Sequence, residues 1–533
     1  MNRTTRFLAP ASLALSAYCP KALVRAIVPH RHLNTLAKAS FLSQKSSLES
    51  GPKQSYMDKL DCKLSTETSD IAAMNDKEDI SCALQRMHVS ETMPENINSL
   101  DINLNSDGVD SIKRRSSIDR SKYKEMRTWK KIGKENKTIN PEESFTFKLL
   151  SFNILAQDLL ETHAYLYTDH NRQALPWEKR KPLLVQEILE SEAHVVCLQE
   201  MQEEHLRDFL LPFQENGFTY LYKKRTNDKK DGLLLMYRED IFNLIEFSKL
   251  ELYQTGVELL SRDNVALIAK FSLKESPETK FVIATTHLLF NPRRNDVRLG
   301  QVQLLFAEIE RMSFVENTSI GPRYLPIVLS GDFNLEPYSG VYKFITDGSI
   351  EFVGKGRNLE RCDYRCLTNS LIPPHLYVTD ECQHFNVLSK RLSGKGSGKV
   401  MLRNTERGEN LQDNESPTSD SEVTDLVDSE STTYQKVEIA DGHYVTFSSG
   451  LLTHPFQFKS VYGHTDSKGK SEATTFQNRW ITVDYIFYSK MQPLESYRLP
   501  TAEECKVFLP TIPNSVVGSD HLCLGASFLL KKR

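Results

Sequence analysis

Short polar blocks interrupt several apolar runs of the sequence that are typical of buried strands. The clearest lies at 326–340, PIVLSGDFNLEPYSG, where Asp332 and Asn334 follow the apolar residues 327–329. Side chains alternate along an extended chain, so these two polar groups are expected on the same side at the carboxyl end of a strand. That end is where open α/β sheets usually bind ligands. Asp, Asn and Gly also form turns for local reasons, so this block alone does not indicate a site.

Further polar blocks follow the same rule. They are Asn153 in LLSFNIL, Gln199-Glu200 in VVCLQEM, His287 in VIATTHLLF, Asp484 in ITVDYIFYS, and Ser519-Asp520-His521 before the last apolar run. Each block alone has an ordinary structural explanation, such as a capping Asn or a hydrogen-bonded core histidine. Burying so many polar groups costs free energy unless they satisfy one another or hold a metal ion. Together the blocks predict one polar functional site.

The elements that would position these blocks alternate between strand and helix patterns. Strand patterns cover 145–155, 194–200, 231–238, 265–273 and 280–290, and they resume at 442–458, 474–489 and 521–530. Apolar residues recur at helical spacing over 177–191, 203–218 and 296–312. This alternation predicts an α/β domain over 145–530.

The composition narrows the class of protein. The 533 residues are 39% hydrophobic, which suits a globular protein, and their formal net charge of -3 means that any nucleic acid must bind a local patch. The cysteines form no CxxC pair and are interpreted as reduced thiols of an intracellular protein. No apolar stretch approaches the roughly 18 residues of a membrane span, so no membrane partner is expected.

Three segments do not fit the globular pattern. Residues 1–45 carry Lys and Arg among Ala, Leu and Ser without an acidic residue, which is typical of a mitochondrial transit peptide and equally of a disordered basic tail. Residues 46–140 are polar and aperiodic, which predicts a disordered linker. Residues 391–435 are Gly/Ser-rich and then acidic, which predicts a disordered insertion. The expected location is the cytoplasm or nucleus, with mitochondrial targeting left open by the N-terminus.

Taken in order, the polar blocks resemble those of the endonuclease/exonuclease/phosphatase superfamily, which includes abasic-site endonucleases, DNase I-like nucleases, inositol phosphatases and neutral sphingomyelinases. Segment 175–201 is similar to the carbon-catabolite-repressor type of deadenylase and to nocturnin. Segment 286–305, THLLFNPRRNDVRLGQVQLL, with no leucine-rich repeat before the domain, is most similar to the Angel branch. The resemblance implies a four-layer α/β sandwich of the DNase I-like type, with two packed mixed β-sheets flanked by helices. It also implies that the chain does not dock into a deadenylase complex through such a repeat.

The resemblance assigns the metal-binding roles. Glu200 would hold Mg²⁺, with Mn²⁺ as an alternative, because such ions prefer oxygen ligands and retain several waters. Asn153 would lie beside this ion and orient a metal-bound water or the phosphate. Asp520 would support a metal or histidine ligand.

The remaining blocks would act on the phosphate. Asp332 would orient and deprotonate the attacking water, and Asn334 would hold that water or a phosphate oxygen. His521 and His287 would bind the phosphate, and Asp484 would fix the tautomer of His521 and favour its imidazolium form.

Substrate contacts are expected from residues close to these blocks. The candidates are Asn291, Arg293, Arg298 and Tyr338, which would contact the 3′ end of an RNA. A basic loop at 223–230 would either steer RNA or be simply solvated, and both readings stay open. Nothing in the sequence indicates an obligate oligomer.

Three functions follow. The first, which the Angel resemblance implies, is an Mg²⁺-dependent phosphatase that hydrolyses 2′,3′-cyclic phosphate at RNA 3′ ends and leaves 2′-OH and 3′-OH termini. The second is an Mg²⁺-dependent 3′–5′ exoribonuclease, a poly(A)-specific deadenylase. Val516-Val517 favours the first function, because deadenylases place aromatic or proline-rich residues there to stack adenines. The third is a catalytically idle RNA-binding regulator, and the intact polar blocks argue against it.

Overall fold

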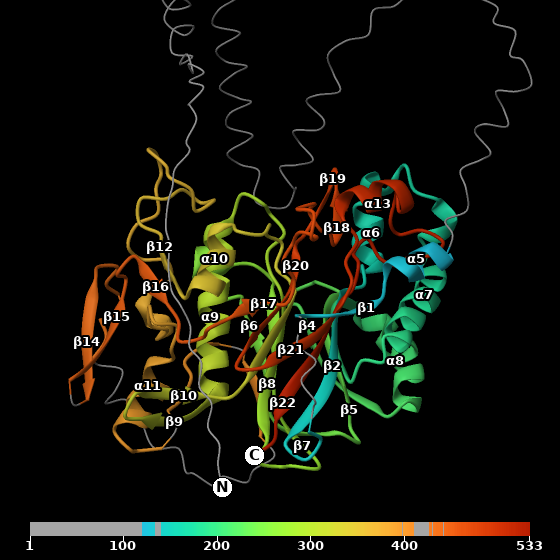
Figure 1. Cartoon of the computed structure of the whole chain (residues 1–533). Coiled ribbons are helices and arrows are strands. Elements are labelled where there is room, and N and C mark those ends of the chain that lie inside the picture. The colour runs from blue at the N-terminus through green and yellow to red at the C-terminus, as the bar shows by residue number, and fades with distance from the viewer. Residues whose placement is uncertain are drawn as a thin grey trace, which may run out of the picture. The chain divides into compact units, whose positions relative to one another are not determined.

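Two mixed β-sheets of seven strands each dominate the part of the chain that the structure describes (Figure 1). The structure is a computed structural model, and it describes residues 120–133, 140–396, 398–403, 405–409, 426–428, 430–440 and 442–533. Helices cover the outer faces of both sheets, which confirms the predicted four-layer α/β sandwich. No helix among the described residues is long and apolar enough to cross a bilayer.

The strand order of each sheet mixes distant parts of the chain. The first sheet runs β1 (Trp129–Lys131), β21 (Gln492–Tyr497), β22 (Leu524–Lys531), β2 (Ser144–Asn153), β3 (Val195–Gln202), β5 (Asp231–Arg238) and β4 (Phe218–Lys224). The second runs β13 (Glu406–Glu409), β6 (Phe242–Glu251), β7 (Val265–Leu273), β8 (Lys280–His287), β11 (Ile327–Asp332), β20 (Asp484–Ser489) and β17 (Lys459–Ser460). Smaller ribbons pair β9 (Phe314–Thr318) with β10 (Gly321–Tyr324), β12 (Ser349–Glu351) with β16 (Leu451–Thr453), β14 (Gln435–Ala440) with β15 (His443–Phe447), and β18 (Thr475–Gln477) with β19 (Arg479–Ile481).

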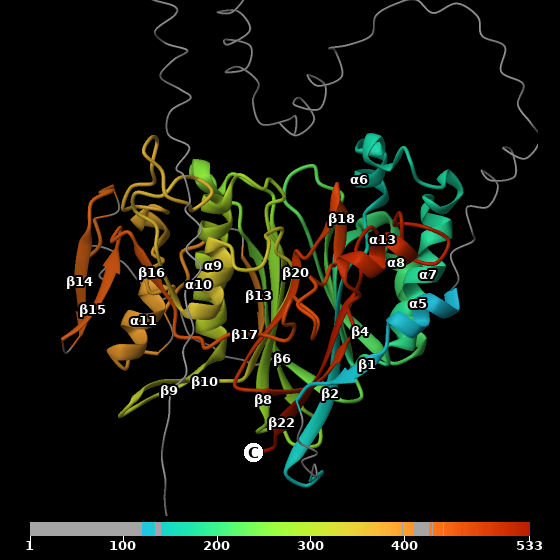
Figure 2. The same cartoon turned by 45° about the horizontal axis from the view of Figure 1, so that its top comes forward.

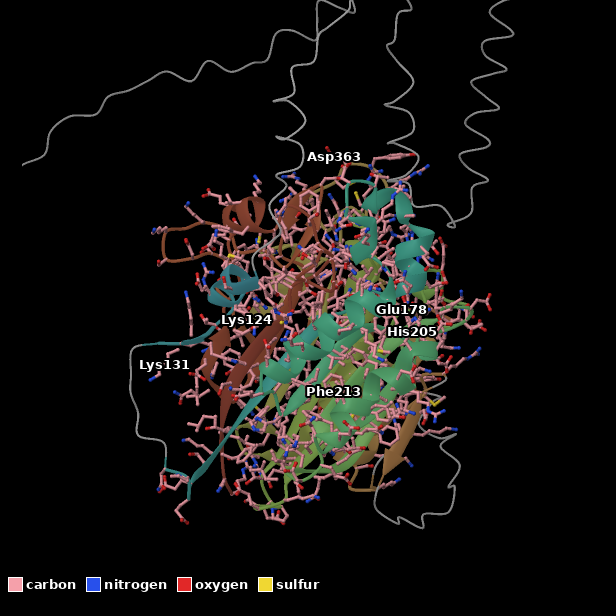
Figure 3. The ribbon with its side chains drawn as sticks, turned by 90° about the vertical axis from the view of Figure 1, so that its right-hand side faces the viewer. Lys124, Lys131, Glu178, His205, Phe213 and Asp363 are labelled. Atoms are coloured by element: carbon pink, nitrogen blue, oxygen red, sulfur yellow. The ribbon has the colours of Figure 1, made fainter. Side chains whose placement is uncertain are left out.

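Helices lie on the two outer faces and around the ends of the sheets. They are α5 (Arg120–Met126), α6 (Gln157–Thr162), α7 (Trp177–Glu190), α8 (Leu206–Glu215), α9 (Asn295–Ser313), α10 (Gly340–Asp347), α11 (Phe385–Leu392) and α13 (Ala502–Phe508). Helices α7 and α8 pack on the first sheet through a buried cluster that includes Phe213, and they face the viewer in Figure 3. Helices α9 and α10 cover the second sheet.

The core between the sheets is built from alternate residues of the facing strands. The ring centroids of Phe147 on β2 and Phe281 on β8 lie 5.3 Å apart across this interface. On β7, Leu267 enters the same cluster, whereas its neighbour Ile268 packs under helix α9. Both faces of this strand are therefore buried, and such strands are continuous apolar runs in the sequence.

The domain begins earlier than the sequence indicated. The expected linker 46–140 contains α5 and β1, and β1 adds an edge strand to the first sheet. The Tyr123 hydroxyl on α5 donates to Glu187 Oε1 on α7 at 2.6 Å, and the buried Arg127 guanidinium donates to the carbonyl of Cys523. These contacts link residues too far apart in sequence to be predicted from local patterns. The predictions for residues 1–45 lie outside the described residues.

The expected disordered insertion at 391–435 is also corrected in part. Within it, β13 extends the second sheet by pairing with β6, and Leu402 is buried. Arg407 Nε on β13 donates to Glu308 Oε1 on helix α9 at 2.9 Å. A buried carboxylate that needs a cation thus anchors a segment whose composition suggested disorder. Residues 410–425 lie outside the described residues.

The pairing register within each sheet places predicted site residues side by side at the ends of neighbouring strands. Strand β11 pairs in parallel with β8 and antiparallel with β20, so Asp332 lies opposite both His287 and Asp484. In the first sheet, Asn153 at the end of β2 lies opposite Gln199 of β3. In Figure 2, α6 and β18 lie at the same end of the domain, above these strands.

Gly331 allows β11 to approach β8 closely just before Asp332. Its φ is +143°, and a Cβ at this position would overlap the carbonyl oxygen of its partner Thr286. That oxygen belongs to a rigid backbone and cannot move aside without disturbing the strand pair. Only glycine therefore fits here without displacing Asp332.

Replacing Gly331 with Ala should destabilise the fold by about 3 kcal/mol or more, because the methyl group would collide with backbone. Thermal and urea unfolding of the purified protein would measure this. Gly463→Ala is the matched control, since its Cβ would meet nothing nearer than Thr465 O at 3.8 Å. Equal stability of the two variants would contradict the prediction.

Candidate active site

The ends of the two sheets meet at the side-chain amide of Asn153. Its Nδ2 donates to Glu200 Oε1 at 2.9 Å and to Asp332 Oδ2 at 3.0 Å. Glu200 belongs to the first sheet and Asp332 to the second. The amide oxygen accepts from the backbone N–H of Leu155 at 3.1 Å, which fixes the orientation of the group. One amide therefore holds two carboxylates from different sheets at a fixed separation.

A bulge in strand β3 sets the orientation of the Glu200 side chain. The φ of Glu200 is +63°, and the register between β3 and β5 shifts between Leu198 and Met201. This bulge turns the carboxylate toward the strand ends, where Oε2 accepts from the backbone N–H of Ala156 at 3.0 Å. Burial, the charge of Asp520 and then that of Asp231 raise the pKa of Glu200 to about 7.

Asp332 lies buried among hydrogen-bond donors and two histidines. Its Oδ1 accepts from the backbone N–H of Asn334 at 2.9 Å. Its Oδ2 lies 3.6 Å from His287 Nε2 and 3.8 Å from His521 Nε2. Burial and the charge of Asp484 raise the pKa of Asp332, whereas the two imidazoles and the Asn153 hydrogen bond oppose that rise.

The two histidines differ in charge because their partners differ. Burial alone would lower the pKa of His521, but the charge of Asp484 and the hydrogen bond from His521 Nδ1 to Asp484 Oδ2 at 2.9 Å raise it well above the usual value. Burial lowers the pKa of His287, and Asp332 only partly opposes this. His287 Nδ1 has no hydrogen-bond partner among the described residues. Asp484 therefore favours the imidazolium form of His521, whereas burial favours the neutral form of His287.

The donor set of the site fits a divalent cation. Among the described residues, Asp332, Asp484 and His521 form one group of ligand-type side chains whose ligand atoms all lie within 4.8 Å of one another. A protonated His521 is a poor metal ligand, because both ring nitrogens then carry hydrogens and neither has a free lone pair, and its Nδ1 is in addition hydrogen-bonded to Asp484. Glu200 offers carboxylate oxygens in a region made negative by Asp520 and Asp231, which favours a bound cation. The residue types thus suit a hard cation near Glu200.

The Ser519-Asp520-His521 block is joined to the first sheet. Ser519 Oγ donates to the backbone carbonyl of Asn153 at 2.6 Å, and Asp520 Oδ2 accepts from the Tyr167 hydroxyl at 2.8 Å. The buried Arg180 guanidinium donates to the carbonyls of Ile154 at 3.0 Å and Gly518 at 3.1 Å. Tyr167 and Arg180 were not predicted from the sequence, because neither stands in a strand pattern with a polar end.

Asn334 has a side chain that is tied to a neighbouring loop. Its φ is +53°, and its Nδ2 donates to the carbonyl of Leu288 at 3.0 Å. The amide oxygen remains as its polar group for other partners, and its role toward water or phosphate stays a prediction. The loop that Asn334 holds begins directly after His287.

Of the residues predicted to contact substrate, one is buried and hydrogen-bonded within the protein, and the others are exposed or half-buried. Arg298 is buried, and its guanidinium donates to the carbonyls of Leu289, Phe290 and Asn291 at 2.8, 3.0 and 2.7 Å. Arg298 therefore shapes the loop after His287 rather than offering free donors to a substrate. Arg293 and Tyr338 are exposed, and Asn291 is half-buried.

The basic loop at 223–230 is largely neutralised by ion pairs. Lys223, Lys224, Arg225 and Lys230 pair with Glu251, Glu203, Asp231 and Asp158, respectively. Charges paired in this way attract a polyanion weakly. The structure thus supports the solvated reading of this loop.

Comparisons with known proteins agree with the resemblance read from the motifs. A model of the endonuclease/exonuclease/phosphatase family matches residues 150–521. Protein angel of Drosophila melanogaster is 31% identical over 420 residues, which cover 76% of this chain and 88% of that protein. Protein angel homolog 2 of Danio rerio is 33% identical over 356 residues, which cover 65% of this chain and 54% of that protein, so this chain spans about half the length of that relative.

A solved structure adds a chemical description. The crystal structure of ANGEL2, described as a 2′,3′-cyclic phosphatase, in complex with adenosine-2′,3′-vanadate matches with a TM-score of 0.58 and 30% sequence identity. The match covers 76% of this chain and 98% of that chain.

Asp484→Asn should lower the pKa of His521 by about one to three units, because removing the opposite charge leaves burial less opposed. The imidazolium would then lose its proton at a lower pH than in the unmodified protein. Histidine NMR titration, with His521→Gln for assignment, would measure the change. Asp240→Asn, which removes an exposed carboxylate paired with Arg238, is the matched control. A His521 signal that titrates identically in both variants would refute the assignment.

Proposed function

Because this chain belongs to the endonuclease/exonuclease/phosphatase family, we propose that it is a metal-dependent 2′,3′-cyclic phosphatase acting on RNA 3′ ends. It would open the cyclic phosphate with one water to give a terminal phosphomonoester, and hydrolyse that monoester with a second water to release inorganic phosphate, which leaves 2′-OH and 3′-OH termini. The observation that carries the proposal is the likeness to ANGEL2, a 2′,3′-cyclic phosphatase, at 30% identity over 98% of that chain. The converged cluster around Asn153 and Asp332 supports it.

The cluster supplies the groups that such hydrolysis needs. Asp332, with its raised pKa, is suited to accept a proton from an attacking water. The His521 imidazolium, 3.8 Å from the same carboxylate, is suited to donate a hydrogen bond to a phosphate oxygen as negative charge develops there. Asn153 keeps Glu200 and Asp332 apart and oriented. A divalent cation bound at Glu200 would add Lewis-acid stabilisation of the phosphate.

Removal of single 3′ nucleotides from poly(A) is the second candidate. Val516 and Val517 were expected to argue against a deadenylase. They do not distinguish the two candidate functions, because both are buried in the core between the sheets and cannot face a nucleobase. Tyr338 and Phe290 are the exposed aromatic side chains in the segments next to Asn334 and His287. They could stack a base of either substrate, so exposed aromatic residues do not distinguish the two candidate functions. The likeness to ANGEL2 is what favours the cyclic phosphatase. An idle regulator is disfavoured because the catalytic groups are assembled.

The decisive experiment offers the purified protein and Mg²⁺ two RNAs of equal length. One ends in 2′,3′-cyclic phosphate and the other in a run of adenosines with a 3′-OH. We expect the first RNA to lose its terminal phosphate and the second to keep its length, as read by mass. Shortening of the adenosine run by whole nucleotides would instead establish an exoribonuclease.

Glu200→Gln should reduce turnover of the cyclic phosphate by about 100-fold or more, because Lewis-acid stabilisation is worth several kcal/mol. Gln has the same size as Glu but lacks its charge, and its NH2 group would face one of the two N–H donors from which Glu200 accepts, so circular dichroism and thermal unfolding must show that the fold is preserved. Chelation of divalent ions by EDTA should abolish activity, and added Mg²⁺ should restore it. Full activity in EDTA would contradict metal dependence.

Metal affinity should fall as the pH drops through about 7, where Glu200 becomes protonated. The sign follows because a carboxyl must lose its proton to bind a cation, so affinity is full above this pKa and decreases below it. Mg²⁺ titration calorimetry at pH 6 and pH 8 would measure it. Asp231→Asn removes one charge that raises this pKa, so the fall should move to lower pH. Identical affinities at both pH values would show that Glu200 does not control binding.

A further inference from the structure

A second basic loop, residues 353–367, stands apart from the polar cluster. It carries Arg357, Arg361 and Arg365, and all three side chains are exposed. These guanidinium groups form no ion pair with the described carboxylates, whereas most basic side chains of the loop at 223–230 do. The loop also contains two acidic residues, Glu360 and Asp363. They are too few to cancel its basic residues, so the loop keeps a net positive charge. We call residues 353–367 the arginine loop.

The arginine loop is held in one shape by its own backbone. The N–H of Gly356 donates to Glu360 O at 2.8 Å, and the N–H of Leu367 donates to Lys355 O at 2.7 Å. The Leu359 side chain is buried in the core and lies against Gly340 at the start of α10. A loop fixed in this way presents its charged side chains without a large ordering cost on binding.

Contacts place the arginine loop beside the loop that follows His287. The N–H of Asp296 donates to Arg357 O at 2.8 Å, and Asn295 Nδ2 donates to Asn358 O at 3.1 Å. Asn295 and Asp296 begin helix α9, directly after the segment that Arg298 clamps. Figure 3 shows Asp363 at the top of the domain, the end at which α6 and β18 lie in Figure 1.

An exposed aromatic ring stands among these charges. The Tyr364 side chain is 73% exposed, and the Arg365 guanidinium lies 5.2 Å from its ring centroid. Stacking of bases on aromatic rings and pairing of Arg with phosphates are the two contacts by which proteins bind single-stranded nucleic acid. One rigid loop here offers both.

We propose that the arginine loop binds the body of a single-stranded RNA, upstream of the 3′ end that enters the polar cluster. Its arginines contact backbone phosphates and Tyr364 stacks a base. This inference rests on the proposed RNA substrate, and it adds a preference for long RNA over a terminal dinucleotide. The paired loop at 223–230 does not share this role.

The test compares two triple variants of the full chain with the same loss of charge. Arg357→Ala/Arg361→Ala/Arg365→Ala alters the arginine loop, and Lys224→Ala/Lys229→Ala/Lys230→Ala alters the other basic loop. Substrates are a dinucleotide and a 12-nucleotide RNA, each ending in 2′,3′-cyclic phosphate. We expect the arginine variant to raise KM for the long RNA at least ten-fold more than KM for the dinucleotide. The lysine variant should change both KM values by the same factor.

A binding measurement keeps this inference separate from the proposed activity. Fluorescence anisotropy of a labelled 12-nucleotide RNA with a 3′-OH needs no turnover. Loss of three phosphate contacts should lower the slope of log affinity against log salt by about 2, at roughly 0.7 per contact on a single strand. Tyr364→Ala should weaken binding about five-fold or more. Equal RNA affinity and salt slope in the unmodified protein and the arginine variant would overturn the inference, even if cyclic phosphate is hydrolysed.

Discussion

The geometry of the site depends on the side-chain amide of Asn153, which joins the two sheets. Its Nδ2 group donates to Glu200 in the first sheet and to Asp332 in the second. Two carboxylates so close together repel each other and lose hydration, and the amide stabilises both at once. Apolar packing between the sheets, such as that of Phe147 against Phe281, holds together the two sheets that this amide joins. A shift of one residue in the register of β11 would turn Asp332 to the opposite face, so packing and chemistry are specified together.

The electrostatics of the site follow from unequal partners for similar groups. His521 and His287 are both buried and both lie near Asp332, yet only His521 has a second carboxylate, Asp484, on its other ring nitrogen. Asp332 therefore faces one ring whose imidazolium form is favoured, which suits stabilisation of negative charge on a phosphate, and one ring whose neutral form is favoured by burial. This asymmetry suits hydrolysis of a phosphoester by water.

Sequence patterns correctly predicted strands whose residues are buried on both faces. They did not predict features that depend on contacts with residues far away in the chain. Strands at 231–238 and 265–273 have the expected bounds, because burial on both faces makes them continuous apolar runs. The strand at 242–251 has polar residues on its outer side and was not predicted. The polar strand ends were identified because their residue types are costly to bury. The role of Tyr167 and the burial of Arg298 depend on contacts with segments far away in the chain or across a loop, and residue type alone does not reveal them.

Under the proposed function, selection among RNA ends must come from outside the polar cluster. In the proposed mechanism, water attack on a cyclic phosphate and on a phosphodiester would both use a base, a charged donor and a bound cation, and the groups around Asp332 and Glu200 would serve either reaction. What differs is the bond presented to them. That choice depends on surfaces such as the loop clamped by Arg298, the exposed ring of Tyr338 and the arginine loop, 353–367. These surfaces lie on loops, which can change without disturbing the strands that hold the polar cluster. One catalytic cluster can thus serve different phosphoester substrates in one family.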